Sequence, residues 1–154
     1  MNIVLKPIVR EDIQTVWEMQ VEAFSSLLSK YQDYEISPAT ESINIIIEKF
    51  NQPWTTYYFI IAHGEKVGVI RIVDKKDGTR KRISPIFILP KYQNKGYAQQ
   101  AILESERLYG RNHWCLATIL EEKQLLYLYE KLGYHQTDII ETNYHMHIVL
   151  YKKN

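Results

Sequence analysis

The stretch QNKGYA, residues 93–98, carries the strongest structural signal in this chain. It stands between a predicted strand and a predicted helix, so its amides fall at a helix N-terminus. The first amides of a helix have no intrahelical acceptor, and the helix dipole adds about half a positive charge there. Gly96 lets the backbone approach an anion closely, Ala98 is small, and Lys95 adds a cation. The stretch therefore predicts a site for a pyrophosphate-like anion, with an ordinary strand-to-helix turn as the alternative.

The predicted strand before this stretch, residues 81–89, contains a proline. Pro85 lacks the amide that a central strand donates to its neighbour. We therefore expect a bulge or an interrupted ladder there, and such a break of a local rule often marks function. The residues that follow recur at helical spacing and predict one face of a helix: Ala98, Ala101, Ile102, Ser105, Leu108 and Tyr109.

A second motif, LYEKLGY at residues 128–134, closes a helix that we expect over residues 122–132. Gly133 falls just after this helix, where a left-handed backbone is common. Tyr129 lies in its last turn. For a tyrosine taken alone, the ordinary interpretation is a core aromatic ring whose hydroxyl meets a neighbour.

Hydrophobic periodicity and turn signals predict the remaining elements. We expect strands over residues 3–9, 56–62, 66–73, 114–119, 134–140 and 146–151, and helices over 11–30 and 38–50, the second capped by Ser37. The complete order is β-α-α-β-β-β-α-β-α-β-β. Consecutive strands predict antiparallel pairs and the strand-helix-strand crossing predicts a parallel pair, so the fold class is α/β (α+β) with a mixed central sheet of about seven strands.

Together, the two motifs and the element order resemble the GNAT superfamily of acetyl-CoA-dependent N-acetyltransferases across essentially the whole chain. Gln93, Gly96 and Ala98 match the Q/R-x-x-G-x-G/A loop of that family, and residues 128–134 match its LYEKLGF signature, with Tyr134 in place of phenylalanine. The resemblance implies the GNAT fold, in which the proline-interrupted strand splays from the next strand and leaves a gap for the pantetheine arm of acetyl-CoA. The cofactor-binding residues that it implies are Phe87, Ile88 and Leu89, through their backbone, and Gln93, Asn94, Lys95, Gly96, Tyr97, Ala98 and Gln99.

The resemblance also implies the reaction. A primary amine of a small molecule or a protein attacks the thioester directly, and coenzyme A leaves as a thiolate. Tyr129 matches the tyrosine general acid of the family. A phenol with a reference pKa of ~10 and a thiol with one of ~8.5 are close enough for proton transfer. Acetyl-CoA is then the co-substrate, and a non-catalytic coenzyme-A-binding sensor of the same fold is the alternative.

Two positions depart from the family pattern. Glu122 stands where many members have an asparagine that contacts the cofactor arm. The strand over residues 83–89 contains no carboxylate that could deprotonate the amine. The base is then a water chain or a residue elsewhere, such as Asp33, Glu35 or His63.

The acceptor side carries a weaker signal, from two predicted loops that contact the acceptor in folds of this kind. The candidate acceptor-binding residues are Tyr31, Asp33, Tyr34, Glu35 and Tyr144. Carboxylates and aromatic rings suit a cationic amine, and a solvated polar loop is the alternative. His145 and His147 supply only half of a metal site, so we expect no metal.

Length and composition set the remaining expectations. The chain has 154 residues, which we interpret as a single N-acetyltransferase domain over 1–154. Lys and Arg number 19 and Asp and Glu number 18, so the net charge of +1 gives no electrostatic case for a nucleic-acid partner. No signal peptide and no apolar run of ~18 residues is present, so we expect no membrane partner and a cytoplasmic location. A homodimer is the one assembly that we consider.

Overall fold

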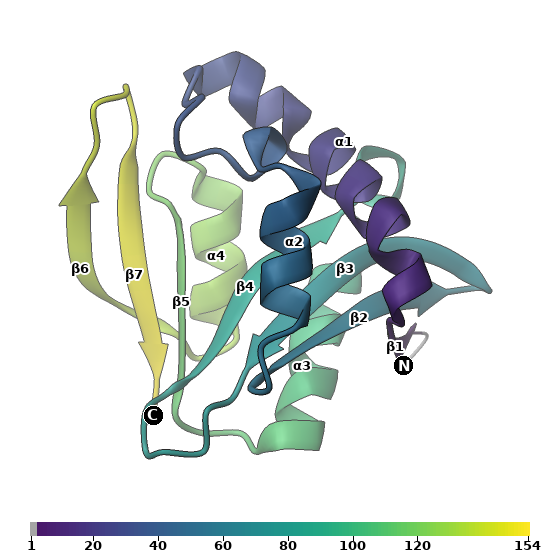
Figure 1. Cartoon of the computed structure of the whole chain (residues 1–154). Helices are drawn as coiled ribbons and strands as arrows, with labels where there is room; N and C mark the ends of the chain where they lie inside the picture. Colours follow the sequence, from purple (N-terminus) through teal and green to yellow (C-terminus); the bar gives the residue numbers. More distant parts are fainter. Residues whose placement is uncertain (1–2) are drawn as a thin grey trace.

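The computed structural model describes residues 3–154, and its elements follow one another in the predicted order (Figure 1). Within these residues the elements are β1 (Ile3–Pro7), η1 (Arg10–Asp12), α1 (Ile13–Tyr31), η2 (Pro38–Thr40), α2 (Ile43–Phe50), β2 (Thr55–Ala62), β3 (Glu65–Val73), β4 (Lys81–Ile88), η3 (Pro90–Tyr92), α3 (Tyr97–Tyr109), β5 (Trp114–Ile119), α4 (Lys123–Lys131), β6 (His135–Glu141) and β7 (His147–Lys153). The three η elements are short 3-10 helices. None of the helices in residues 3–154 combines the length and the apolar character that crossing a bilayer requires.

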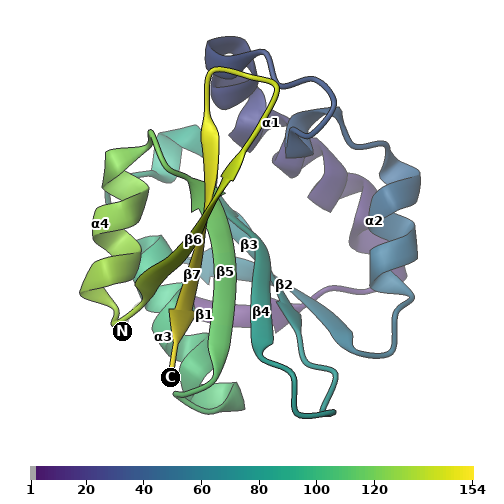
Figure 2. The same ribbon diagram turned by 90° about the vertical axis from the view of Figure 1, so that its left-hand side faces the viewer.

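The seven strands form one mixed sheet in the order β1-β2-β3-β4-β5-β7-β6. β4 and β5 pair in parallel, and the other neighbours pair antiparallel. Helices α1 and α2 cover one face of the sheet, and α3 and α4 cover the other (Figure 2). The structure thus confirms the predicted α/β class and the GNAT arrangement of a mixed seven-stranded sheet.

Two hydrophobic clusters, one on each face, hold the helices to the sheet. Successive residues of a strand point to opposite faces, so neighbours in β2 and β3 serve different clusters. Phe59 and Val69 pack toward α1 and α2, whereas Ile60 and Ile70 pack toward α3. The centre of the sheet is therefore buried on both sides, and this fixes β4 and β5 between two helical layers.

β4 and β5 stay together only at their beginnings. The parallel ladder contains two register pairs, Lys81 with Trp114 and Arg82 with Cys115. Just beyond them, at Pro85, the register of β4 against β3 also shifts. Figure 1 shows the two strands diverging from there. The predicted interruption at Pro85 and the splayed strand pair are both confirmed.

The helix expected over residues 38–50 is divided in two, which corrects the sequence prediction. Ser37 does cap, since its Oγ accepts a hydrogen bond from the Ala39 amide at 3.1 Å, but it caps only the short η2. The backbone at Glu41 is extended, and its carbonyl accepts a hydrogen bond from Trp17 Nε1 at 2.9 Å. The cross-link from α1 thus replaces a helical hydrogen bond, and α2 begins only at Ile43.

The buried face of α3 also differs from the prediction at one position. Leu108 is 48% exposed, whereas Glu106 is buried. The Glu106 carboxylate accepts hydrogen bonds from Lys153 Nζ at 2.8 Å and from the Tyr134 hydroxyl at 3.3 Å. These partners are distant in the sequence, so helical periodicity alone could not indicate a buried acid there.

Candidate active site

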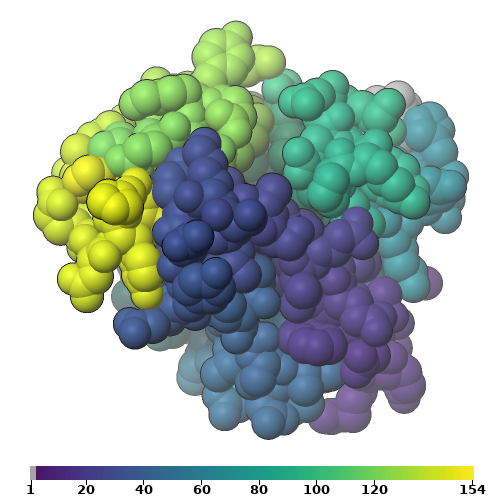
Figure 3. Space-filling view, turned by 90° about the horizontal axis from the view of Figure 1, so that it is seen from above, coloured from purple at the N-terminus to yellow at the C-terminus, as the bar shows by residue number. Residues whose placement is uncertain are grey.

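A cavity of about 940 Å³ opens where β4 and β5 diverge. This lies near the upper end of the usual range for ligand pockets, roughly 300–1,000 Å³. Its walls come from β4, β5, the end of α1 and the segment after it, the start of α3, α4, and the β6–β7 turn. Seen from above in Figure 3, the segment after α1, in dark blue, lies beside both the β6–β7 turn and α4.

The beginning of α3 forms one end of the cavity. No side chain caps this helix, and its Ncap residue, Gly96, has a φ of 82°. The first amide with a helical acceptor is that of Gln100, which donates to the Gly96 carbonyl at 3.1 Å. The preceding amides, from Tyr97 to Gln99, therefore remain open at the positive end of the helix dipole. Since Tyr97, Ala98 and Gln99 line the cavity, this end suits an anion.

Glycine is favoured at position 96 by its backbone conformation and not by a lack of room for a side chain. A Cβ added there would meet only the Gln100 side chain, at 3.9 Å. The left-handed backbone is what favours glycine. Asn94, two residues earlier, is also left-handed, with a φ of 63°. The loop therefore turns twice before the helix and presents its backbone to the cavity. We call residues 93–99 together with the outer part of β4 the cofactor end.

The outer part of β4 directs only some of its backbone into the gap. The Leu89 amide donates to the Val67 carbonyl of β3 at 2.8 Å. Because alternate strand residues direct their backbone groups to opposite neighbours, Phe87 also faces β3, and Ile88 faces the gap. The Ile88 carbonyl accepts a hydrogen bond from Gln93 Nε2 at 3.0 Å. Leu89 does not line the cavity and its amide is not free, which corrects its predicted role, while Phe87 contributes its side chain.

Tyr129, on α4, lies in the cavity wall. It is 5% exposed, and its ring packs against those of Tyr134 and Tyr151, with centroids 6.2 and 6.1 Å away. Among residues 3–154, no group hydrogen-bonds its hydroxyl. Burial raises the pKa of Tyr129 to about 12, because the phenolate would be poorly solvated. The hydroxyl is therefore protonated at neutral pH and free to donate to a ligand.

Glu122, at the Ncap of α4, ties α1 to α4. Its Oε2 accepts hydrogen bonds from Lys30 Nζ at 2.7 Å and from the Tyr31 hydroxyl at 2.5 Å, and its Oε1 accepts one from Gln124 at 2.9 Å. Burial opposes its charged form, but these hydrogen bonds outweigh burial and lower the pKa of Glu122. Tyr31 therefore serves this link, and it does not line the cavity.

The other end of the cavity, which we call the acceptor end, is formed by the segment after α1 and the β6–β7 turn. Asp33, Glu35 and Tyr144 line it, as predicted, and the Glu35 amide donates to the Tyr144 hydroxyl at 3.2 Å. Tyr34 is 59% exposed and lies outside the cavity, in a neighbouring depression. His63, one of the three candidate bases, lies in the β2–β3 turn and outside the cavity.

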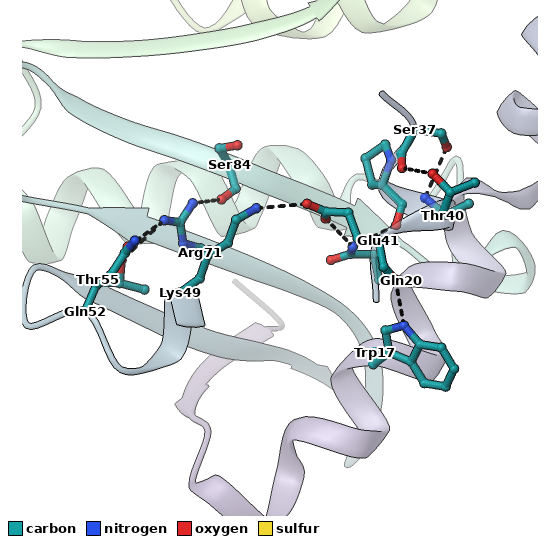
Figure 4. Close-up of polar contacts among 12 residues, drawn as sticks. Trp17, Gln20, Ser37, Thr40, Glu41, Lys49, Gln52, Thr55, Arg71 and Ser84 are labelled. Atoms are coloured by element: carbon teal, nitrogen blue, oxygen red, sulfur yellow. Dashed lines mark hydrogen bonds and ion pairs between the residues drawn. The ribbon is translucent and has the colours of Figure 1, made fainter. Parts of the chain in front are cut away.

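Two groups of hydrogen bonds involve β4 and the segment that follows α1 (Figure 4). Arg71 Nη1 donates to the Ser84 carbonyl of β4 at 2.7 Å, which holds the irregular part of the strand in place. The Glu41 carboxylate accepts hydrogen bonds from Gln20 at 2.7 Å and from Lys49 at 3.3 Å. The first contact links β3 to β4, and the second group links α1 to α2 through Glu41. Sequence reasoning missed them because each joins residues of different elements.

The structure thus brings most of the predicted site residues to one cavity. The predicted residues that line it are Asp33, Glu35, Phe87, Ile88, Gln93, Asn94, Gly96, Tyr97, Ala98, Gln99, Tyr129 and Tyr144. Leu89, Lys95, Tyr31 and Tyr34 do not. Within residues 3–154, no three His, Cys, Asp or Glu side chains form a group that could hold a metal ion.

The geometry of the cavity agrees with the comparison against known protein families. The family described as "Acetyltransferase (GNAT) domain" matches residues 53–136, more than half of the chain. The chain belongs to the GNAT acetyltransferase family. It is accordingly an acetyl-CoA-dependent N-acetyltransferase by family.

Relatives within and around the GNAT family act on amines. Spermidine N(1)-acetyltransferase of Escherichia coli K12 is 25% identical over 144 residues, which cover 86% of this chain and 73% of that protein. The structure of Vibrio cholerae spermidine N-acetyltransferase in complex with CoA and spermine has a TM-score of 0.75 at 16% identity, covering 97% of this chain and 94% of that one. The PaiA N-acetyltransferase of Thermoplasma acidophilum, in complex with coenzyme A, has a TM-score of 0.73 at 18% identity and full coverage of both chains. The solved structures share the fold with this chain.

Proposed function

We propose that this chain transfers the acetyl group of acetyl-CoA directly to a primary amine, with Tyr129 as the general acid and residues 1–154 acting as a single domain. One observation carries the proposal. The cavity joins an uncapped helix N-terminus, a gap between two splayed strands, and the hydroxyl of the buried residue Tyr129, which has no hydrogen-bond partner among the described residues. The helix N-terminus suits an anion, the gap suits an extended arm that bears a thioester, and the tyrosine hydroxyl suits proton donation.

The cofactor end fits coenzyme A without a cluster of cations. The open amides from Tyr97 to Gln99 would bind the pyrophosphate, and the Ile88 backbone would pair with an amide of the pantetheine arm. The aromatic rings of Phe24 and Phe87, in edge contact at 5.6 Å, line the gap beside the arm. Acetyl-CoA would supply the activated acetyl group as its thioester.

The reaction needs two proton movements. The amine loses a proton and forms the new C–N bond to the acetyl carbon, and the C–S bond breaks as the sulfur receives a proton. Tyr129 is the donor for the second movement, because burial keeps its hydroxyl protonated at neutral pH. No acid or base side chain on residues 83–89 serves the first movement. We propose that water in the cavity carries that proton away.

The acceptor is a small amine or an amino group of a protein. The names of the relatives make spermidine the first acceptor to test, together with amino acids, aminoglycosides and peptides. The test measures thiol release from acetyl-CoA across this panel. Rapid release with at least one acceptor supports the proposal. Release with none would contradict catalysis.

Cofactor binding is measured separately, by the rise of the unfolding temperature with acetyl-CoA. A ligand at 100 times its dissociation constant stabilises the folded state by about 2.7 kcal/mol. A rise without turnover on any amine would favour the coenzyme-A-binding sensor. No rise at all would contradict both the transferase and the sensor.

A further inference from the structure

Asp33 is a buried acid whose carboxylate oxygen Oδ1 has no hydrogen-bond partner in residues 3–154. It follows α1, is 4% exposed, and lines the acceptor end of the cavity. Its Oδ1 is buried without a hydrogen-bond partner, and no ion pair involves this carboxylate among residues 3–154. A buried carboxylate in this state is strongly unfavourable unless a cation or donors meet it.

The Asp33 backbone shows that this position is held by the fold. Its carbonyl accepts hydrogen bonds from the amides of Ile36 at 3.0 Å and Ser37 at 2.8 Å. The segment around it is fixed to α1 by the Gln32 amide, which donates to Leu28 at 2.7 Å. The carboxylate is therefore kept in the cavity wall by a closed turn, although no residue in the described part of the chain partners its Oδ1 there.

A buried acid with a structural role looks different in this protein. Glu106 is also 4% exposed, but Lys153 and Tyr134 both hydrogen-bond its carboxylate. Glu122 is buried too, and three side chains satisfy its two oxygens. Because the fold satisfies its other buried acids, the unpartnered state of Asp33 points to a ligand.

The charges around the cavity identify the chemistry of that ligand. Asp33, Glu35, Glu122 and Glu141 line it, and no Lys, Arg or His does among the residues described. Lys30 neutralises Glu122 from outside the cavity at 2.7 Å, and His147 contacts Glu141 at 3.1 Å. Glu35 is exposed and solvated. Among the charged residues that line the cavity, the buried one without a counter-charge is the acid Asp33, so its missing partner is a cation.

We propose that Asp33 binds an ammonium group of the acceptor other than the one that is acetylated, so that the preferred acceptor is an aliphatic amine with at least two amino groups. This inference rests on the proposed acetyl transfer. An amine that attacks must first lose its proton, and an ion pair with a carboxylate opposes that loss. Asp33 therefore suits the ammonium that stays protonated and sets the specificity, while the second amine reaches the thioester.

The first test compares two acceptors with the same four-carbon chain, 1,4-diaminobutane and 1-aminobutane, by thiol release with the full chain. We expect the wild type to prefer the diamine by about tenfold or more in kcat/KM. Asp33→Asn should raise the KM for the diamine about 10- to 100-fold, leave kcat within about threefold, and change neither constant much for the monoamine. Asp138→Asn, which removes an exposed carboxylate on β6, is the matched control and should behave as the wild type.

Two results would overturn the inference. The first is a wild type with equal kcat/KM for the diamine and the monoamine, which contradicts the inference before any variant is made. An Asp33→Asn variant that loses kcat equally for both acceptors, with an unchanged KM, would make Asp33 a base or a structural residue. The unfolding temperature checks the structural role, because removing an unpartnered buried charge should not lower it.

A binding measurement keeps this inference separate from the proposed function. With coenzyme A present, 1,4-diaminobutane should raise the unfolding temperature of the wild type and not that of Asp33→Asn. This result would stand even if no acceptor were acetylated, in which case the proposed function fails and the cation site remains. Equal shifts for both proteins would contradict the cation site whatever the turnover.

Discussion

The two ends of the cavity present different chemical groups to a ligand. The cofactor end uses open backbone amides at the start of α3 and a strand edge, and its lining contains no charged side chain. The acceptor end uses carboxylates from the segment after α1 and from the β6–β7 turn. The first can bind a ligand common to a family, because a helix N-terminus binds phosphate whatever side chains surround it. The second can change its ligand by changing one side chain.

This difference also separates what each end does to the ligand. Backbone amides bind without titrating, so cofactor affinity should depend little on pH near neutrality. The acceptor end contains ionisable side chains and depends on links such as Glu122 and His147 that carry charge. We therefore expect substitutions at the two ends to change different constants, with Tyr129 affecting the chemical step.

The largest effect is expected for Tyr129→Phe. This change removes only the hydroxyl, so packing against Tyr134 and Tyr151 is retained. We expect kcat to fall about 10²- to 10⁴-fold, the usual contribution of a general acid, with the affinity for acetyl-CoA unchanged. Steady-state thiol release measures the first quantity, and a thermal-shift titration measures the second.

Tyr127→Phe on the same helix is the matched control for Tyr129→Phe. Tyr127 is 70% exposed and does not line the cavity, so its variant should turn over as the wild type does. Equal turnover of Tyr129→Phe and the wild type would remove Tyr129 from the mechanism. A loss of acetyl-CoA affinity in Tyr129→Phe would instead mean that the Tyr129 hydroxyl contributes to cofactor binding.

Much of the cofactor end could be predicted from the sequence because its determinants are local. Gly96 and the residues after it specify a helix start by their own conformational preferences, and Pro85 interrupts a strand because of its missing amide. Such signals lie within a few residues of the structure that they cause. The prediction still went wrong at Leu89, whose amide is taken by Val67. The direction of each backbone group depends on the register between strands, which the sequence does not contain.

The acceptor end could be predicted only as a list of residue types. Tyr31 and Asp33 are two residues apart and both were candidates, but one bonds Glu122 across 91 residues while the other faces the cavity alone. Nothing near either residue signals this outcome, because the partner belongs to another element. The one available signal was Glu122 itself, an acid in place of the family asparagine, which required a cation or a donor nearby.

The second prediction concerns Gly96→Asp. The added carboxylate would lie at the helix N-terminus where the pyrophosphate is proposed to bind, so we expect affinity for coenzyme A to fall about 10- to 100-fold. The KM for the acceptor amine should change far less. Titration of coenzyme A by thermal shift, together with acceptor KM at saturating acetyl-CoA, separates the two ends.

Conformation and charge must be distinguished at Gly96. Gly96→Asn adds a side chain of the same size without charge at the same left-handed backbone, which Asn tolerates comparably to Asp. Gly78→Asp places the same change in an open turn with a φ of 91°. We expect Gly96→Asn to weaken binding less than Gly96→Asp, and Gly78→Asp not at all. Undiminished affinity in Gly96→Asp would place the phosphates elsewhere.

The third prediction is a loss of stability in Glu122→Gln. The amide cannot accept the same charge-assisted hydrogen bonds from Lys30 and Tyr31, so we expect a loss of about 1–3 kcal/mol in the free energy of unfolding at pH 7. The folded pKa of Glu122 is lowered from 4.5, so its stabilisation is present above about pH 4.5 and is lost as pH falls through the folded value. Denaturant unfolding at pH 7 and at successively lower pH measures both.

The difference between the wild type and Glu122→Gln should therefore shrink on acidification. Lys30→Met tests the same link from the exposed side. It should lower the free energy of unfolding less than Glu122→Gln does, because Glu122 keeps Tyr31 and Gln124 as partners. A difference that stays constant down to low pH would mean that the Glu122 charge does not stabilise the fold. Unchanged cofactor affinity in Glu122→Gln would also mean that Glu122 does not make the cofactor contact that the asparagine makes in many members of the family.

The smallest effect is expected at His147, and it has the opposite dependence on pH. The ring bonds Glu121 at 2.6 Å and Glu141 at 3.1 Å, and these carboxylates outweigh burial and raise the pKa of His147 above 6.5. A raised pKa means that the stabilisation is fully present below about pH 6.5 and is lost as pH rises through the folded value. His147→Gln should thus unfold slightly below the wild type at pH 6 and together with it at pH 9. If its deficit grew toward pH 9 instead, the His147 charge would not fasten the β6–β7 turn, and the acceptor end would be held by packing rather than by charge.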